Sequence, residues 1–353
     1  MARPLPEILP VPWPAGLPAP PTRTEEAVLR AAQLLADGGL VAIPTETVYG
    51  LAANALDADA IDRIFAAKRR PAGNPLIVHV ADAAMARRLA ADWPTAAERI
   101  TSSLWPGPVT VIVPRGHSIP DAVTAGGPTV ALRCPEHPLA RWLIARLGAP
   151  LAAPSANRST QLSPTTAGHV LDSLGNRVDL ILDGGPCGRG IESTVVDCTT
   201  NPPRILRPGP IGRAALEAVL GGPVIDMLTE HADVETTTEP ARSPGQLARH
   251  YAPKTPLELT STAMERVTAL LQAGKRVAWL TAATADPQVR QLAASQDVVI
   301  VPMPTDPATF AASLYATLHA VDRRSLDAII IDTPPDTDDW RAVADRLRRA
   351  ATS

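Results

Sequence analysis

The sequence predicts an α/β protein with two domains: a larger domain on a twisted, mixed sheet with helices, and a small domain on a parallel, Rossmann-like sheet. Three observations support this fold class. Short apolar runs alternate with helical patterns along most of the chain. The length of 353 residues corresponds to two domains of ordinary size. Hydrophobic residues make up 45% and charged residues 20% of the chain, which is enough for a large core.

The first 21 residues differ from the rest of the chain in composition. They hold eight of the 38 prolines. Because proline fixes φ and cannot donate a backbone hydrogen bond, such a segment favours extended chain over packed structure. We therefore expect an extended, poorly ordered leader over residues 1–21.

The larger domain is predicted over residues 22–222. A buried strand at 40–43 leads into the polar turn 44–47, and residues 57–67 have helical spacing with Asp57 or Asp59 as the N-cap. Further strands are predicted at 76–80, 109–113, 130–132, 151–153, 180–182, 194–196 and 205–206, and further helices at 83–91, 96–104, 138–147 and 213–219. Strands joined by irregularly spaced helices favour a large mixed sheet.

The small domain is predicted over residues 257–353. Its short apolar strands, at 257–259, 277–280, 298–301 and 329–331, alternate with helical stretches. Such a βαβ series predicts a parallel sheet. No glycine-rich phosphate motif follows its first strand, so we predict no nucleotide site there. Residues 223–256 are polar and poor in strand patterns, and we interpret them as a linker that could close as a lid.

Composition also excludes several functional classes. The 33 basic and 36 acidic side chains nearly cancel, and aromatic residues make up only 3% of the chain, which argues against a general polyanion-binding or base-stacking surface. The three cysteines, Cys134, Cys187 and Cys198, lack disulfide or zinc-site spacing. We find neither a membrane-spanning apolar run nor a signal-peptide pattern, and we expect a cytoplasmic protein.

The candidate chemistry consists of polar residues at the ends of apolar strands, where open α/β sheets bind ligands. Cationic and neutral donors occur there at Lys68, Arg70, Arg133, Ser155, Asn157 and Arg207. Arginine forks match phosphate and carboxylate oxygens, so the pattern indicates a cleft for anionic ligands. Individual arginines could equally be surface residues, His79 a core histidine, and the glycine-dense segment 184–190 a simple turn.

Taken together, these segments resemble the threonylcarbamoyl-adenylate synthase family, also called the YrdC/TsaC proteins. The resemblance covers about residues 24–220 and rests on six elements in order. These are residues 44–51 (PTETVYGL), Lys68 with Arg70, 74–79 (NPLIVH), 105–110 (WPGPVT), Ser155 with Asn157, and 192–195 (ESTV). The segments 243–245 (SPG) and 250–253 (HYAP), followed by a small α/β unit, resemble the long, two-domain branch, whose first domain would be a YrdC-like twisted mixed sheet.

The resemblance implies a nucleotidyltransferase. L-threonine, bicarbonate and ATP would give threonylcarbamoyl-AMP and pyrophosphate, the first step of the threonylcarbamoyladenosine (t6A) modification of tRNA. Mg2+ would accompany ATP, and the resemblance implies no protein-bound prosthetic group and no metal-ligating residue. It implies downstream tRNA threonylcarbamoyl-transfer proteins as partners, weak or indirect tRNA binding, and no membrane.

The resemblance also assigns residues. Lys68 and Arg70 would be catalytic. L-threonine would contact Thr47, His79, Arg133, the backbone at Ala153, and Ser193. ATP would contact Arg70, Asn74, Thr129, Ser155, Asn157, Ser163, Arg207 and Tyr251.

Two alternatives remain open from the sequence. One is O-carbamoyl transfer of the hydrogenase-maturation type, in which a similar module occurs beside zinc-binding cysteine pairs that this chain lacks. The other is a module that binds double-stranded RNA through its shape, which would require a basic face.

Overall fold

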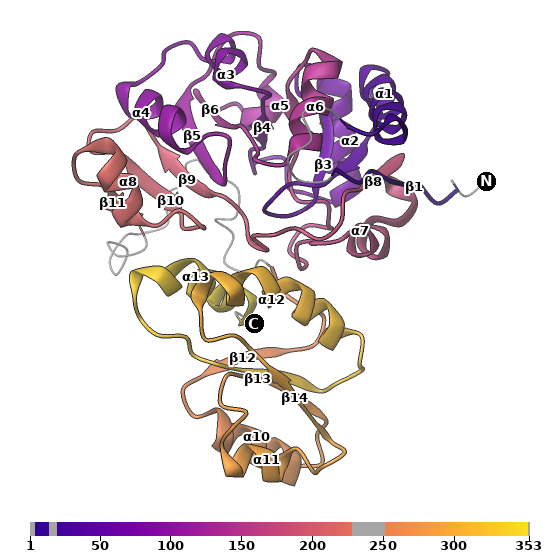
Figure 1. The fold of residues 1–353 in the computed structure, drawn as a ribbon, viewed down its shortest axis with the longest axis vertical. Helices are drawn as coiled ribbons and strands as arrows, with labels where there is room; N and C mark the ends of the chain where they lie inside the picture. The colour runs from indigo at the N-terminus through magenta and orange to yellow at the C-terminus, as the bar shows by residue number, and fades with distance from the viewer. Residues whose placement is uncertain (1–3, 14–19, 228–250, 352–353) are drawn as a thin grey trace. The chain divides into compact units, whose positions relative to one another are not determined.

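The computed structural model describes residues 4–13, 20–227 and 251–351, which fold into two compact units (Figure 1). The first unit contains most of the chain up to residue 246. The second contains residues 247–353 together with two short segments, 160–162 and 189–191. Each unit is built on its own sheet, as the sequence predicts.

The sheet of the first unit is mixed and has eleven strands in the described ranges. Their order is β1-β8-β2-β3-β7-β4-β6-β5-β9-β10-β11. The strands are β1 Glu7–Pro10, β2 Val41–Ile43, β3 Gly50–Asn54, β4 Ile77–His79, β5 Val109–Pro114, β6 Thr129–Arg133, β7 Leu151–Ala152, β8 Leu180–Asp183, β9 Thr194–Asp197, β10 Arg204–Arg207 and β11 Ile225–Asp226. The helices are α1 Thr22–Ala36, α2 Ala58–Lys68, α3 Ala83–Leu89, α4 Thr95–Leu104, α5 Asp121–Thr124, α6 Pro138–Leu147, α7 Ala167–Leu174 and α8 Arg213–Leu220.

Helix α2 shows how local sequence positions functional residues. Asp57 caps it by accepting hydrogen bonds from the backbone N–H groups of Asp59 and Ala60, as expected from its residue type. The helix ends at Lys68 because Arg69 takes the left-handed conformation, with φ of 52°. The chain therefore leaves the helix axis at Arg69, which separates two predicted site residues, Lys68 and Arg70.

Several features of the first unit differ from the sequence expectations, among them the helices α1 and α5, which the sequence did not predict. The prediction of a poorly ordered leader is wrong for residues 7–10, which form β1 and pair in parallel with β8. Strand β3 and helix α7 were not predicted either, because alanine, glycine and histidine weaken their apolar patterns. Strand β11 lies within the predicted linker 223–256, and residues 228–250 of that linker lie outside the described residues.

The second unit confirms the predicted parallel sheet. Its strands are β12 Leu257–Thr260, β13 Val277–Thr281, β14 Val298–Pro302 and β15 Ala328–Asp332, in the order β12-β15-β13-β14 and all parallel. Its helices are α10 Ala263–Gln272, α11 Pro287–Leu292, α12 Pro307–Asp322 and α13 Arg341–Ala351. Figure 1 shows α10 and α11 on one face of this sheet and α12 and α13 on the other, a three-layer arrangement.

Side chains alternate between the two faces of the strands β4, β6, β5 and β9. The residues Val78, Leu132, Val111 and Val196 belong to the main core of the first unit. Their neighbours Ile77, Ala131, Ile112 and Val195 point to the opposite face and form a separate small apolar cluster. We call this second side the site face, because it carries the predicted functional residues described below.

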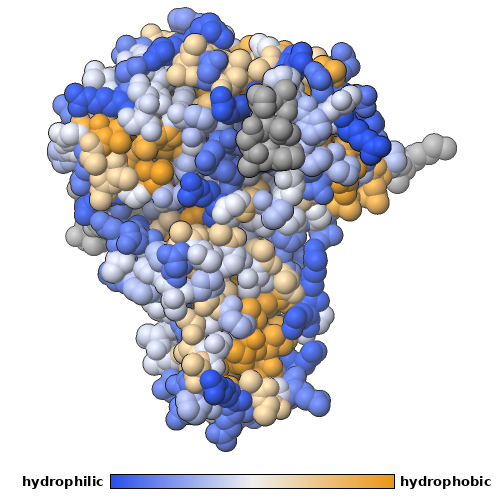
Figure 2. Space-filling model, in the orientation of Figure 1, coloured by the Kyte–Doolittle hydropathy of each residue, from blue (hydrophilic) through white to orange (hydrophobic). Residues whose placement is uncertain are grey.

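No helix in the described part of the chain is long and apolar enough to span a bilayer. In the view of Figure 2, hydrophilic residues cover much of the surface, and apolar residues gather in separate patches.

Replacing Gly190 with alanine should destabilise the protein. Gly190 has φ of +71°, and an added Cβ would lie 2.5 Å from the backbone of Ala311 and Ala312 in α12. Backbone atoms there cannot move aside easily, so we expect Gly190→Ala to lower the free energy of unfolding by about 1–3 kcal/mol. Urea denaturation would measure the loss.

Gly188 provides a matched control in the same loop, because a Cβ there meets nothing within 4 Å. Gly188→Ala should change the free energy of unfolding by less than about 0.5 kcal/mol. Equal effects of the two substitutions would contradict the assigned packing of residue 190.

Candidate active site

The predicted site residues gather on and around the site face of the larger sheet. His79 of β4 is the register partner of Arg133 of β6, and Arg207 of β10 is the partner of Val195. Paired residues in a sheet point to the same side, so the histidine and both arginines lie on the face that carries the small apolar cluster. The site therefore combines an apolar floor with cationic side chains at its border.

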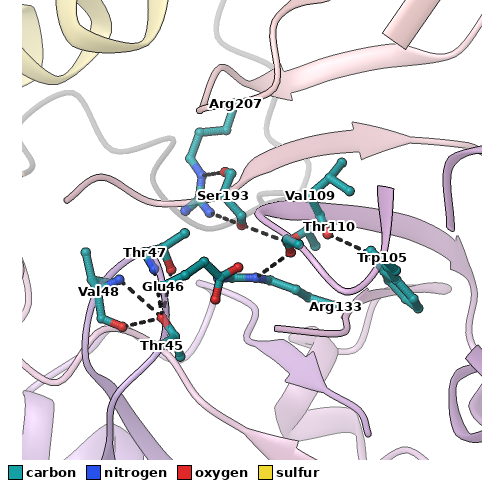
Figure 3. Close-up of polar contacts among 11 residues, drawn as sticks. Thr45, Glu46, Thr47, Val48, Trp105, Val109, Thr110, Arg133, Ser193 and Arg207 are labelled. Carbon is teal, nitrogen blue, oxygen red and sulfur yellow. Dashed lines mark hydrogen bonds and ion pairs between the residues drawn. The ribbon is translucent and has the colours of Figure 1, made fainter. Parts of the chain in front are cut away.

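A buried ion pair joins the first signature turn to the sheet. Nη2 of Arg133 donates to Oε1 of Glu46 at 2.6 Å, and the two side chains are directed at each other in Figure 3. Glu46 is 9% and Arg133 is 4% exposed. Arg133 is a predicted site residue, whereas its partner Glu46 received no role from the sequence. The signal that could have identified Glu46 was a lone carboxylate within a turn expected to face several cations.

Hydroxyl groups fix the conformation of this turn. Oγ1 of Thr45 donates to the carbonyl of Val48 at 2.6 Å and lies 2.9 Å from Oγ1 of Thr47, as Figure 3 shows. The backbone N–H groups of Thr47 and Val48 both donate hydrogen bonds to Oγ1 of Thr45. Thr47, a predicted threonine ligand, is therefore held in place beside Glu46.

His79 is neutral in the folded protein. Burial, and then the positive charge of Arg133, lower its pKa to about 3. Among the described residues, its Nδ1 atom has no hydrogen-bond partner. A neutral imidazole beside a guanidinium can donate or accept a hydrogen bond without adding charge, which suits the predicted contact with a small polar ligand.

A second polar network lies where β9 begins. Oγ of Ser193 lies 2.8 Å from Oγ1 of Thr110, and Arg207 donates to both the carbonyl and Oγ of Ser193 at 3.1 Å (Figure 3). One residue earlier, Glu192 accepts a hydrogen bond of 2.5 Å from Oγ of Ser163. The predicted residues Ser193, Arg207 and Ser163 are thus brought to one region of the first unit.

Lys68 is buried against the loop that carries Ser155 and Asn157. Its ammonium group donates to the carbonyl oxygens of both residues, and the contact with Asn157 measures 2.5 Å. Burial, and then the charge of Arg70, hold the pKa of Lys68 well below its usual value. The predicted lysine and Ser-x-Asn elements therefore form one unit in which the cation also shapes the loop.

Arg70 and Asn74 form the next group along the chain. Arg70 donates to Oδ1 of Asn74 at 2.6 Å and to the carbonyl oxygens of Asn74 and Pro75. Within the described ranges, the buried Nδ2 atom of Asn74 has no partner. An amide donor without a partner beside a buried guanidinium suits the binding of an anion.

Three predicted residues stand apart from these contacts. Thr129 lies on the site face but at the opposite end of β6 from Arg133, about 13 Å away along the strand. The backbone N–H of Ala153 already donates to the carbonyl of Ile77, so a contact with threonine would use the carbonyl oxygen of Ala153. Tyr251 belongs to the second unit, where it packs against Tyr315 and Arg346. Their assigned ligand contacts stay predictions.

The described residues contain no group of three or more histidine, cysteine, aspartate or glutamate side chains that could hold a metal ion. Burial raises the pKa of the Cys187 thiol to about 12, so the thiol is protonated and is a poor nucleophile. The arrangement instead supplies buried cations and neutral donors in fixed positions. Such groups bind anions and stabilise charge that develops during a transfer reaction.

The pKa of His79 predicts how stability depends on pH. Because the folded-state pKa of about 3 lies below the unfolded value near 6.5, stability is complete above pH 6.5 and falls as the pH drops towards 3. Between pH 7.5 and 5.5 the wild type should lose about 1.4 kcal/mol more unfolding free energy than His79→Gln, which cannot titrate. Denaturation at both pH values measures this difference, and equal losses would refute a neutral His79.

Comparison with known proteins identifies the family of the chain. The family model described as "Telomere recombination" (Sua5/YciO/YrdC) matches residues 33–209, and that described as "Threonylcarbamoyl-AMP synthase, C-terminal domain" matches residues 211–352. The chain is 41% identical to the threonylcarbamoyl-AMP synthase of Bacillus subtilis over 329 residues, which cover 92% of each protein. It is 37% identical to the threonylcarbamoyl-AMP synthase of Pyrococcus abyssi over 339 residues, covering 93% of this chain and 95% of that protein.

A solved structure agrees in fold over both units. Sua5 of P. abyssi complexed with L-threonine matches the chain with a TM-score of 0.85 at 35% sequence identity, covering 98% of this chain and 97% of that one. With both family models matched in order and relatives aligned over nearly their full length, the chain belongs to the two-domain Sua5 branch of the threonylcarbamoyl-AMP synthase family.

Proposed function

We infer that the chain is an L-threonylcarbamoyladenylate synthase, a nucleotidyltransferase that acts in the t6A modification of tRNA. It joins L-threonine, bicarbonate and ATP into threonylcarbamoyl-AMP and releases pyrophosphate. The observation that carries this conclusion is the set of four buried cations: Arg133 and Arg207 on the site face, and Lys68 and Arg70 at the end of α2. Positive charges buried in one region favour anionic ligands, and this reaction supplies a carboxylate, a carbamate and a triphosphate.

The threonine end of the site is built around Arg133. Its Nη1 group makes no hydrogen bond within the described ranges, so it can receive the carboxylate of the amino acid while Nη2 holds Glu46. Thr47, neutral His79 and Ser193 provide uncharged polar contacts for the remaining atoms of threonine. The amine of bound threonine then attacks bicarbonate to give a carbamate.

The nucleotide end of the site comprises Arg70, Asn74, Ser155, Asn157, Ser163 and Arg207, with Lys68 beneath the loop. We propose that the carbamate oxygen attacks the α-phosphate in line, with pyrophosphate as the leaving group. Such a transfer depends on positioning and charge neutralisation rather than on a protein nucleophile. Lys68 and Arg70 supply fixed positive charge where the pentacoordinate phosphorus gains negative charge.

Mg2+ enters this proposal as part of the substrate, bound to the phosphates of ATP, where it neutralises charge. The described residues hold no group of three or more histidine, cysteine, aspartate or glutamate side chains that could bind the ion by themselves. We therefore assign the phosphate oxygens and water as its main ligands. Free, buried cysteines fit a reducing compartment, which supports action in the cytoplasm. Proteins that transfer the threonylcarbamoyl group to tRNA would be the partners, and tRNA binding by this chain itself would be weak or indirect.

Pyrophosphate release tests the proposed function. The purified chain should release pyrophosphate from ATP only when both L-threonine and bicarbonate are present, and mass spectrometry should identify threonylcarbamoyl-AMP. Release that ignores threonine or bicarbonate would overturn the assignment.

Removing the charge of Lys68 should slow turnover more than it weakens threonine binding. Lys68→Met keeps the length of the side chain but removes its ammonium group. We expect kcat to fall by about 100-fold or more, and the Kd for threonine to change by less than about 3-fold. Steady-state kinetics and calorimetry give the two quantities.

The control for this substitution is Lys275→Met, since Lys275 is exposed and pairs with Asp327 at the surface of the second unit. It should leave both quantities unchanged. A Lys68→Met enzyme that turns over normally would mean that the lysine only shapes the loop at Ser155 and Asn157.

Serine should be a poorer substrate than threonine. The two amino acids differ by one methyl group, and a closed pocket gains about 1–3 kcal/mol from enclosing it. We expect kcat/KM for threonine to exceed that for serine by about 10-fold or more. Competition between the two amino acids in one reaction, read by mass spectrometry of the adenylates, measures the ratio. A ratio near one would show that the pocket leaves the methyl group in water.

A further inference from the structure

The carboxylate of Glu46 has one oxygen engaged and one that remains unsatisfied. Oε1 accepts the hydrogen bond from Arg133, whereas Oε2 is buried and has no partner among the residues that the structure describes. A buried carboxylate oxygen without a donor costs free energy, because it has lost water and gained nothing in return. A ligand that brings a donor to Oε2 would recover that cost.

Glu46 cannot easily turn this oxygen towards solvent. The residues on either side of it, Thr45 and Thr47, share a hydrogen bond between their hydroxyl groups, and Thr45 also holds Val48. The other oxygen is tied to Arg133 on β6. The carboxylate is therefore fixed from two separate parts of the chain, and its position does not depend on a ligand.

The pair offers one negative and one positive group side by side. Arg133 keeps its Nη1 donors for an anion, and Glu46 keeps Oε2 for a donor or a cation. The titratable groups that feel the charge of Glu46 are His137, Cys134 and Cys187, and burial lowers the pKa of the histidine and raises the pKa of both thiols, so none of them satisfies Glu46 with a charge at neutral pH. An α-amino acid carries a carboxylate and an ammonium group on the same carbon, and this spacing matches two opposite charges held next to each other.

We propose that Glu46 recognises the α-ammonium group of the amino-acid substrate and accepts its proton, a role that rests on the proposed function. The ammonium group must lose a proton before its nitrogen can attack. In the first step, R–NH3+ and the Glu46 carboxylate give R–NH2 and the carboxylic acid.

The second step forms the carbamate. The nitrogen lone pair forms a C–N bond to the carbon of bicarbonate, a C–O bond breaks, and the leaving hydroxide takes a proton from nitrogen. The sum is R–NH2 plus HCO3− giving R–NH–COO− and water, which balances in atoms and charge. Glu46 afterwards returns its proton to solvent.

The test compares L-threonine with (R)-3-hydroxybutanoate, which has the same carbon skeleton, hydroxyl and carboxylate but no amine. Calorimetry on the full chain should show that the wild type binds threonine at least about 30-fold more tightly. Glu46→Gln keeps an oxygen for Arg133 but replaces the acceptor Oε2 with an amide N–H2. It should lose about 10-fold or more in threonine affinity while its affinity for hydroxybutanoate changes by less than about 3-fold.

The two ligands separate recognition from structural damage. A structural role for Glu46 predicts equal losses for both ligands, and that result would overturn the proposal. Undiminished selectivity in Glu46→Gln would overturn it as well. If Glu46→Gln fails to fold, the wild type alone still tests the proposal. A wild-type preference for threonine over hydroxybutanoate below about 3-fold would show that nothing in the site recognises the amine.

Glu25→Gln is the matched control. Glu25 pairs with Arg146 at the same distance of 2.6 Å, but this pair is exposed on the helices α1 and α6. Its substitution should leave the affinities for both ligands unchanged. Failure of the proposed function can be told apart from failure of this inference. In the first case the wild type would release no pyrophosphate in response to bicarbonate, whatever its selectivity between the two ligands.

Discussion

The alternation of side chains along four neighbouring strands is the constraint on which the site depends. One set of positions on β4, β6, β5 and β9 must be apolar, because it packs into the main core of the first unit. The intervening positions are then free to carry His79, Arg133 and Thr110 on the other side. A slip of one residue in the register would exchange the two sets and bury charges in the core. Hydrophobic packing on one face thus sets the positions of the functional groups on the other.

Burying several cations in one region is costly, and the structure meets this cost with hydrogen bonds from each cation to neutral oxygen atoms or to a carboxylate. Lys68 rests on the carbonyls of the loop after β7, Arg70 on the chain before β4, and Arg207 on Ser193. Each cation is fixed before a substrate arrives, so little reorganisation is needed during the reaction. The same hydrogen bonds also hold the loops in place. Residues that bind the substrate therefore also contribute to the stability of the fold.

Regular patterns made much of the fold predictable. The strands β4 to β6 and the helices α2 and α6 follow from regular apolar periodicity, with an aspartate cap for α2. The parallel pairing of the second sheet follows from its βαβ pattern, whereas its strand order was not predicted. Strand β1 was not predictable, because its parallel pairing with β8, some 170 residues away, overrides the local effect of proline.

The site was only partly predictable from the residues themselves. Cations at strand ends indicated an anion cleft, but only the resemblance to a family assigned His79 and Ser193 to threonine. Glu46 escaped both kinds of reasoning, since its importance lies in its contact with Arg133, which is 87 residues away in sequence. A lone carboxylate in the signature turn hinted at a role for Glu46, but only the structure identifies Arg133 as its partner.

The second unit is assembled from three pieces of the chain, and this has a consequence for how such a protein could be shortened. Ala252 donates to the carbonyl of Thr160 and bridges Gln161, while Gly190 lies against α12. These contacts end two residues before Ser163 and Glu192, which are hydrogen-bonded to each other. No single cut separates the two units, and a gene that lost the codons for residues 247–353 would leave both loops without the residues that contact them. A working protein made from the first unit alone would therefore need new residues to hold those loops, so the loss of the second unit demands compensating changes inside the first.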